Sequence, residues 1–386
     1  MPIVGMVGGG QLARMTAQAA IELGATFRVL AGSPSESAAL VTRDVSVGSH
    51  LSLADVAGFA AQCDAITFDH EHVPASVLTS LESSGILVRP GSAALRYTQD
   101  KLAMREKLSS LGVPCPRFAP VSSAADVESF ASGSWPVVLK AVSGGYDGKG
   151  VWVCSSASEA ASVVAAAESH GISLLAEEFV PFRRELAALI ARSPSRQGAA
   201  YPVVETVQVE GICREVIAPA PGLPASVAEE AQSLALGIAS SLDVIGLLAV
   251  ELFETSSGGL LVNELAMRPH NSGHWTMDGA CTSQFEQHLR AVLDLPLGSP
   301  APSCPGGYTV MANILGGTDS DIYDRYIHVM AADPAVKVHF YGKEIRLGRK
   351  IGHVNIAGGP SDSVESLRDR ARRAASYLRW GTEDGD

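Results

Sequence analysis

A glycine-rich stretch between two apolar segments constrains the fold of this chain most strongly. Residues 144–150 read Gly-Gly-Tyr-Asp-Gly-Lys-Gly, with an apolar run and Lys140 before them and the apolar run 151–153 after them. Four glycines in seven residues let the backbone fold closely over a ligand. Because no Lys-Ser or Lys-Thr pair follows, the pattern predicts two strands joined by a flap rather than a loop that opens a helix. Such a flap is typical of a cover over nucleotide phosphates, and a solvated hairpin turn is the alternative.

The composition of the chain limits the class of protein. Its 386 residues are 46% hydrophobic and 18% charged, which is typical of a globular protein with more than one domain. The 41 acidic and 29 basic residues give a net charge of −12, which argues against a surface for nucleic acid or anionic membranes. The six cysteines lack metal-ligand spacing, and the first apolar run reads as a strand rather than a leader. We therefore expect a cytoplasmic protein with no nucleic-acid or membrane partner.

Residues 1–90 alternate short apolar runs with helical patterns. The runs cover 3–7, 27–30, 65–68 and 86–88, and apolar residues recur at helical spacing between 12 and 23. This alternation predicts a small parallel α/β domain. Residues 8–13 match the GxGxxA pattern of dinucleotide-binding turns, but no carboxylate ends the run 27–30. NAD binding is therefore not expected, although the turn can still hold a phosphate or another anion.

The rest of the chain reads as a mixed α/β body with a separate C-terminal part. Helical patterns cover 99–111, 157–169, 225–242 and 363–378. Strand-like runs cover 173–180, three segments within 184–220, 247–254, 259–265, 308–315 and 336–341. Residues 296–307 hold four prolines and three glycines, so they are the best candidate for a linker.

Two glutamates stand inside a predicted hairpin of apolar strands. Glu251 lies within Ala-Val-Glu-Leu-Phe and Glu264 within Leu-Val-Asn-Glu-Leu, with a short polar loop between the two strands. Burial of a carboxylate is costly unless it is paired or binds a metal. If the strands pair, both carboxylates converge on one hard cation, and Mg²⁺ prefers such oxygen ligands. The alternatives are that each glutamate faces solvent or pairs with an arginine.

Two further segments are rich in groups that bind polar or anionic ligands. Residues 268–275 read Arg-Pro-His-Asn-Ser-Gly-His-Trp, a density of donors that suits a small molecule with phosphate and hydroxyl groups. Residues 343–350 carry four cations in an otherwise acidic chain. A loop capped by its own hydrogen bonds and a solvated basic face are the respective alternatives.

These motifs together resemble those of a known enzyme family. Residues 9–15 (Gly-Gly-Gln-Leu-Ala-Arg-Met), the flap, Asn-Glu-Leu at 263–265, the string at 268–275 and Gly-Arg-Lys-Ile-Gly-His at 348–353 occur in this order. The set closely resembles carboxyaminoimidazole ribonucleotide synthase, the ATP-grasp ligase of microbial purine synthesis. The string at 268–275 is its most specific part, and the match runs from the first strand into the last hundred or so residues.

The resemblance implies an α/β protein of the ATP-grasp class in three parts. An N-terminal parallel α/β domain is expected over residues 1–92, and a central ATP-grasp body over 93–302 with a lid at about 115–180. A small, β-rich C-terminal domain is expected over 303–386. The family also suggests a homodimer.

The resemblance further implies the ligands and the residues that hold them. The ligands are ATP, Mg²⁺, bicarbonate as co-substrate, and aminoimidazole ribonucleotide. The implied ATP-binding residues are Arg96, Lys140, Gly144, Gly145, Tyr146, Asp147, Gly148, Lys149, Gly150, Glu177, Glu178, Phe179, Val180, Glu185, Asn263 and Glu264. The implied metal ligands are Glu251 and Glu264. The implied ribonucleotide-binding residues are Gln11, Leu12, Glu71, Tyr146, Asp147, Arg268, His270, Asn271, Lys343, Arg349 and Lys350.

The family's activity implies carboxylation of the exocyclic amine of the ribonucleotide. ATP converts bicarbonate into the short-lived carboxyphosphate, and the amine then attacks its carbon and loses a proton. Asp147 is the expected general base, with Lys343 and Arg349 as further catalytic residues. The alternatives are another ATP-grasp ligase, such as a formate-dependent glycinamide ribonucleotide transformylase, an NAD-dependent oxidoreductase, and a catalytically silent nucleotide-binding module.

Overall fold

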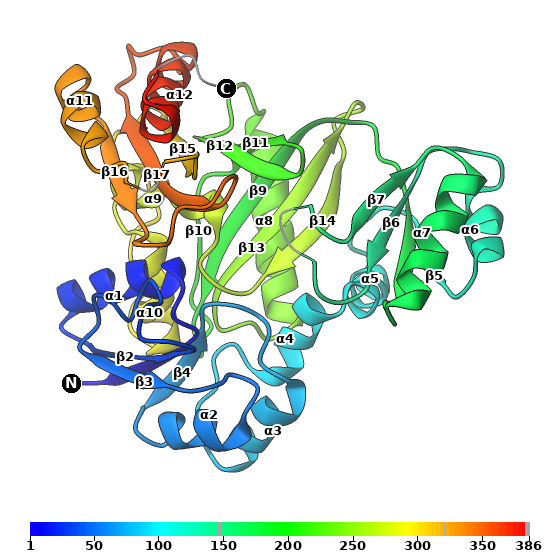
Figure 1. Ribbon diagram of the computed structural model, residues 1–386, viewed down its shortest axis with the longest axis horizontal. Coiled ribbons are helices and arrows are strands. Elements are labelled where there is room, and N and C mark those ends of the chain that lie inside the picture. The colour runs from blue at the N-terminus through cyan, green and yellow to red at the C-terminus, as the bar shows by residue number, and fades with distance from the viewer. Residues whose placement is uncertain (146–147, 320, 383–386) are drawn as a thin grey trace.

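The structure is a computed structural model that describes residues 1–145, 148–319 and 321–382. Its elements surround a long central sheet, with an N-terminal lobe, a C-terminal lobe and a lobe that projects to one side (Figure 1). None of the helices within these described residues is both long enough and apolar enough to span a membrane.

The N-terminal lobe is built on a parallel sheet, as the alternation of apolar runs and helices predicts. The strands in spatial order are β3 (Asp44–Val47), β2 (Thr26–Ala31), β1 (Ile3–Val7) and β4 (Ala65–Phe68). The helices are α1 (Gln11–Leu23), α2 (Leu53–Ala60) and α3 (Ala75–Ser83). The strand expected at residues 86–88 is wrong, because only a single bridge joins Ile66 and Val88. Pro90 comes two residues after Val88 and lacks the N–H that a continued strand needs.

The central sheet is antiparallel and forms the body of the molecule. Its spatial order is β14 (Leu260–Ala266), β13 (Gly246–Thr255), β9 (Phe182–Arg192), β11 (Val204–Val209), β12 (Ile212–Ala218), β15 (Thr309–Leu315), β17 (Lys350–Ala357) and β16 (Lys337–Phe340), with β10 (Gly198–Ala200) beside β9. Helix α8 (Ala225–Ser241) packs on β9 and β13, where Ile238, Ile190 and Leu248 share one core. The apolar stripe of this helix is thereby buried.

The C-terminal lobe continues this sheet instead of forming a sheet of its own. Helix α10 (Gln284–Val292) leads into the predicted linker at 296–307, and β15 follows and pairs with β12. Strand β17, which the sequence analysis did not identify, then pairs with both β15 and β16. The remaining C-terminal helices are α9 (Thr276–Gly279), α11 (Arg325–Ala332) and α12 (Val364–Trp380), and a 3₁₀ turn covers Asn271–Gly273.

The projecting lobe contains the flap. Its sheet has the order β5 (Phe118–Val121), β8 (Leu174–Glu178), β6 (Val137–Ala141) and β7 (Val151–Cys154), with α6 (Ala124–Ala131) and α7 (Ala157–Ser169) against it. Strands β6 and β7 pair antiparallel on either side of residues 142–150, so the predicted strand–flap–strand is confirmed.

Two helices lie between the N-terminal lobe and the projecting lobe in the chain. The expected helix at 99–111 is shorter, because α4 (Ser92–Gln99) ends before α5 (Lys101–Ser110) begins. Asp100 separates the two helices and caps α5 by accepting a hydrogen bond from the Ala103 N–H.

Candidate active site

A carboxylate pair lies on the hairpin of β13 and β14. The register of the two strands places Glu251 directly opposite Glu264, as the sequence analysis expects of a paired hairpin. Glu185 of the neighbouring strand β9 stands close enough for its charge to act on Glu251. Burial and the charges of Glu264 and Glu185 raise the pKa of Glu251 to about 7, and burial raises the pKa of Glu185 to about 7 as well. Burial and the neighbouring carboxylates thus both disfavour the ionised form of Glu251.

Lys101 and His270 touch this carboxylate pair. The Lys101 ammonium lies 2.5 Å from Glu264 Oε1, and His270 Nε2 lies 3.4 Å from Glu251 Oε1. Burial lowers the pKa of His270 to about 3, so the imidazole is neutral near pH 7 and its contact with Glu251 is polar rather than ionic. Within the described residues, no group of three or more acidic, histidine or cysteine side chains surrounds a metal position. Two carboxylates fit Mg²⁺, which completes its shell with phosphate oxygens and water.

A buried ion-pair triad joins the projecting lobe to the hairpin. Glu177 at the end of β8 is 2% exposed and lies 2.6 Å from Arg105 Nε and 2.8 Å from Lys140 Nζ. Burial raises the pKa of Glu177, but the adjacent Lys140 and Arg105 charges outweigh it and lower this pKa overall. Lys140 Nζ also donates to Asn263 Oδ1 at 3.1 Å, and Asn263 precedes Glu264 on β14. The triad thus holds the lysine of β6 beside the hairpin of β13 and β14.

The flap backbone requires its glycines. Gly144, Gly145, Gly148 and Gly150 all have φ between 75° and 80°, a region that L side chains rarely adopt. A Cβ on Gly145 would lie 2.6 Å from the carbonyl oxygen of Lys149, so the turn closes too tightly for any side chain there. Tyr146 and Asp147, which the sequence analysis assigns to ATP and to the ribonucleotide, lie outside the described residues.

The other predicted ATP contacts come from α4 and from the end of β8 and the segment after it. Phe179 of the segment after β8 is half exposed, whereas Val180 is buried, and Glu178 Oε1 accepts a hydrogen bond from the Arg117 N–H at 2.8 Å. Phe182 stacks on Phe253 with ring centroids 4.8 Å apart. Arg96 lies on α4, with its guanidinium carbon 5.4 Å from the ring centroid of Tyr97.

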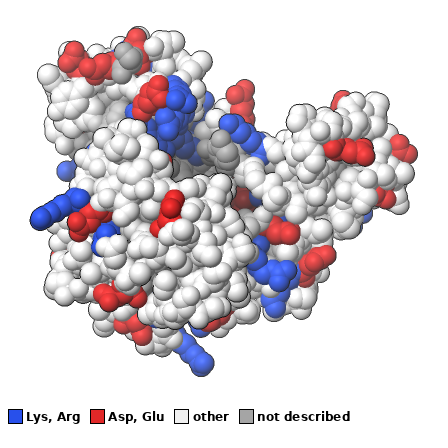
Figure 2. Space-filling model, turned by 60° about the horizontal axis from the view of Figure 1, so that its bottom comes forward, with Lys and Arg blue, Asp and Glu red and all other residues white. Residues whose placement is uncertain are grey.

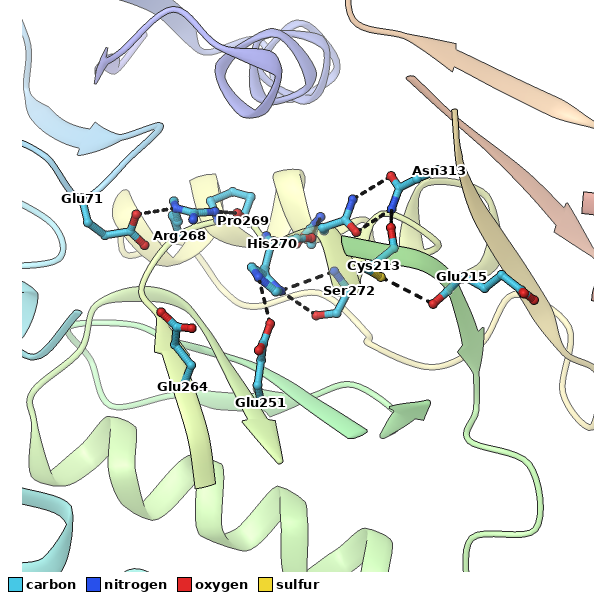
Figure 3. Close-up of polar contacts among 12 residues, drawn as sticks. Glu71, Cys213, Glu215, Glu251, Glu264, Arg268, Pro269, His270, Ser272 and Asn313 are labelled. Carbon is cyan, nitrogen blue, oxygen red and sulfur yellow. Dashed lines mark hydrogen bonds and ion pairs between the residues drawn. The ribbon is translucent and has the colours of Figure 1, made fainter. Parts of the chain in front are cut away.

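The donor-rich segment 268–275 crosses over the carboxylate pair. Figure 3 shows Arg268 reaching Glu71 and His270 reaching Glu251 from one continuous segment. Arg268 Nε donates to Glu71 Oε2 at 2.8 Å, which joins this segment to the N-terminal lobe. Asn271 forms a reciprocal amide pair with Asn313 of β15, at 2.9 and 2.8 Å. Side chains far away in sequence, and not the loop alone, therefore hold the segment.

The sequence analysis left open that the N-terminal glycine turn binds an anion. Three backbone N–H groups of this turn are instead taken up by carboxylates of the protein itself. Asp69, at the end of β4, accepts from the Gly10 and Ala13 N–H groups at 2.6 and 3.1 Å. Glu36 accepts from the Gly9 N–H at 3.1 Å. Two of the protein's own carboxylates thus occupy the position where a dinucleotide would place its pyrophosphate. Sequence reasoning missed both residues, although an acidic residue directly after a parallel strand is a usable signal for Asp69.

Residues 343–350, the basic segment, face this turn across a cavity of about 750 Å³. Lys343 and Arg349 line it, and so do His50, His70 and His72. Figure 2 shows a group of basic side chains beside a hollow between the projecting lobe and the rest of the molecule. Lys350 begins β17, and its charge acts on both Glu251 and His270. The structure therefore brings Lys350 and the segment 268–271 to the carboxylate pair, whereas Gln11 begins α1 after the glycine turn and Leu12 is buried in the core of the N-terminal lobe.

Comparisons with known proteins agree with this arrangement. Family models match residues 1–99 as "Ribonucleotide synthetase preATP-grasp domain", 106–285 as "ATP-grasp domain" and 309–367 as "Phosphoribosylaminoimidazole carboxylase C-terminal domain". The N5-carboxyaminoimidazole ribonucleotide synthase of Mycobacterium tuberculosis is 52% identical over 384 residues, which cover 98% of this chain and 88% of that protein.

Solved structures show the same fold. The N5-carboxyaminoimidazole ribonucleotide synthetase from Thermus thermophilus has a TM-score of 0.86 at 37% identity and covers 98% of both chains. The enzyme from Aspergillus clavatus, solved in complex with ADP and 5-aminoimidazole ribonucleotide, has a TM-score of 0.88 at 28% identity and covers 98% of both chains. An identity of 52% over nearly the whole length carries the assignment beyond the fold alone. The chain belongs to the N5-carboxyaminoimidazole ribonucleotide synthase family.

Proposed function

We propose that this protein uses ATP to join bicarbonate to the exocyclic amine of 5-aminoimidazole ribonucleotide, giving N5-carboxyaminoimidazole ribonucleotide, ADP and phosphate. The proposal is carried by one observation: Glu251 and Glu264 face each other on the hairpin, with the Lys140 amine and the segment 268–271 beside them. The Aspergillus clavatus relative was solved with both ADP and the ribonucleotide, which supports a site that takes both ligands.

The ATP half would lie between the projecting lobe and the hairpin. Its residues would be those implied by the resemblance, namely Arg96, Lys140, the flap 144–150, Glu177, Glu178, Phe179, Val180, Glu185, Asn263 and Glu264. In this set Glu177 acts through Lys140, because both of its oxygens are taken up by Lys140 and Arg105. Mg²⁺ would be held by Glu251 and Glu264 and would neutralise charge on the migrating phosphoryl group.

The ribonucleotide half would lie on the other side of the carboxylate pair. Its residues would be Gln11, Leu12, Glu71, Tyr146, Asp147, Arg268, His270, Asn271, Lys343, Arg349 and Lys350. Bicarbonate oxygen attacks the γ-phosphorus and ADP leaves, which gives carboxyphosphate. The amine then attacks the carboxyl carbon, phosphate leaves, and the nitrogen loses one proton to Asp147, while Lys343 and Arg349 orient the anionic groups.

A phosphate-release assay tests this function. Phosphate should appear from ATP only when bicarbonate and aminoimidazole ribonucleotide are both present, because the carboxyl acceptor is needed to complete turnover. Equal turnover with formate and glycinamide ribonucleotide would favour the transformylase instead. Asp147→Asn should keep ATP binding and lose carboxylation, and unchanged carboxylation would place the base elsewhere.

The resemblance supports further proposals about organisation. We propose domain boundaries at residues 92 and 302, with the lid at about 115–180. We also propose a homodimer that works in the cytoplasm. Light scattering after size exclusion measures the mass in solution, and a mass near 40.1 kDa would contradict the dimer.

A further inference from the structure

One buried glutamine holds the backbone of the segment that crosses the active site. Gln284, the first residue of α10, has no exposed surface. Its Oε1 accepts from the His270 N–H at 2.8 Å, and its Nε2 donates to the His270 carbonyl at 2.8 Å. The side-chain amide thus pairs with the peptide groups on both sides of the His270 Cα, in the way that a neighbouring strand would. Among the residues that the structure describes, no strand pairs with the segment at this point, since β14 ends at Ala266.

The same amide also sets the state of a second histidine. Gln284 Nε2 lies 2.9 Å from His274 Nδ1. An amide nitrogen only donates, so His274 Nδ1 must accept and its proton must sit on Nε2. The segment passes so close to the glutamine that a Cβ on Gly273 would lie 2.4 Å from Gln284 Oε1. Gln284 therefore fixes the segment at both His270 and His274, with a glycine between them as the point of closest approach.

The helix that carries Gln284 is itself anchored to both sheets. Phe285, the next residue, packs in the core of the N-terminal lobe. His288 Nδ1 accepts from the Leu247 N–H of β13 at 3.1 Å, so its Nε2–H donates to Thr67 of β4 at 2.7 Å. One turn of α10 thus fixes the position of Gln284 relative to β13, the strand of Glu251.

We infer that Gln284 is a positioning residue for the carboxylation reaction. It holds the His270 peptide so that the imidazole faces Glu251. The inference rests on the proposed function, because it acts through a residue assigned there to the ribonucleotide. The imidazole is aimed by a second contact, since His270 Nδ1 lies 2.9 Å from Ser272 Oγ and leaves Nε2 toward Glu251. A misplacement of about 1 Å at such a site lowers a rate by about 100-fold.

The same helix offers a matched control. Gln287 is equally buried, accepts from the Gly298 N–H at 2.7 Å and donates to the Gly298 carbonyl at 2.8 Å. This clamp has the same chemistry as that of Gln284, but it holds the linker instead of the segment 268–275. Loss of the Gln287 clamp removes two hydrogen bonds, and loss of the Gln284 clamp removes two of the same kind together with the contact to His274 Nδ1. Both variants should therefore lose thermal stability, and Q284M should lose somewhat more. Only loss of the Gln284 clamp should change the reaction.

The kinetic test compares Gln284→Met with Gln287→Met, since methionine keeps the length but neither donates like an amide nitrogen nor accepts like an amide oxygen. Q284M should lower kcat by about 10- to 100-fold, with KM for ATP unchanged, while Q287M keeps the wild-type kcat. In a double-mutant cycle, adding Q284M to His270→Asn should cause no further loss, because the clamp acts through His270. Additive losses, or equal kcat in the two glutamine variants, would overturn the inference.

A spectroscopic test separates the clamp from the proposed function. Nitrogen-15 histidine spectra of the substrate-free wild-type protein should show His274 with its proton on Nε2, and Q284M should shift the His274 signals while Q287M leaves them in place. A wild-type His274 protonated on Nδ1 would overturn the clamp itself. A wild-type protein with this His274 signature but no carboxylation would instead overturn the proposed function. If Q284M does not fold and Q287M does, Gln284 has a stability role alone and the inference fails.

Discussion

Replacement of Glu251 by glutamine should stabilise the metal-free protein, although Glu251 is assigned to the metal. Glu251 faces Glu264 across the hairpin and also feels the charge of Glu185, and burial adds to this repulsion. A carboxyl pKa raised from 4.5 to about 7 corresponds to about 3 kcal/mol of native-state free energy, at about 1.36 kcal/mol per pH unit. Because 27% of the side chain is exposed, solvent screens part of this, and we expect a gain of about 1–2 kcal/mol.

The sign of the effect follows from the raised pKa. Between pH 4.5 and about 7 the native protein binds more protons at Glu251 than the unfolded chain, so its stability falls as pH rises through this window. The penalty is absent below pH 4.5 and complete above about pH 7. Glutamine is neutral throughout, so the melting temperature of E251Q in EDTA should equal that of the wild type near pH 4.5 and exceed it at about pH 8.

A second glutamate on the same strand provides the control. Glu254 is more deeply buried than Glu251 and lies 2.5 Å from Arg184 Nε, so Glu254→Gln breaks an ion pair and should destabilise the protein. With the Mg²⁺–ATP complex at about 100 times its dissociation constant, the wild type should gain about 2.7 kcal/mol, and E251Q should gain less. Destabilisation of E251Q at about pH 8 in EDTA, or a gain that does not change with pH, would refute the argument.

Two further variants test the charges around the carboxylate pair. Lys101→Met removes a positive charge that lowers the pKa of Glu251, so the pH profile of activity at subsaturating Mg²⁺ should move to higher pH; an unmoved profile would contradict the coupling. Glu177→Gln leaves the buried charges of Arg105 and Lys140 without their partner, so it should cost about 3–5 kcal/mol of stability in calorimetry and raise KM for ATP. Glu178→Gln is the matched control for stability, since Glu178 is less buried and accepts from the Arg117 backbone, and equal losses of stability in the two variants would contradict a specific role for the triad.

Local patterns in the sequence predict much of this fold. The loop between β13 and β14 is short, so the pairing of Glu251 with Glu264 follows from two apolar runs and a polar turn. The flap strands pair for the same reason. The helix predicted at 157–169 agrees with α7, because Ser156 caps it and an amphipathic run follows.

Contacts between distant parts of the chain could not be predicted in this way. Periodicity gives no partner for Asn313, which meets Asn271 only because β15 joins the central sheet. Glu36 and Asp69 close the glycine turn from two different loops, so the turn alone suggested an open anion site. The role of Gln284 is equally hidden, because a glutamine at the start of a helix is usually exposed.

The pairing of β12 with β15 limits how the enzyme can be divided and how it can open. A cut in the linker at 296–307 would leave an unpaired edge on each fragment, and such edges recruit other chains and cause aggregation. The C-terminal lobe is therefore bound to the body by a row of backbone hydrogen bonds, and cannot swing away without unzipping a sheet. The projecting lobe is under no such constraint, because its four strands belong to a sheet of their own, and we propose that this lobe moves to admit nucleotide.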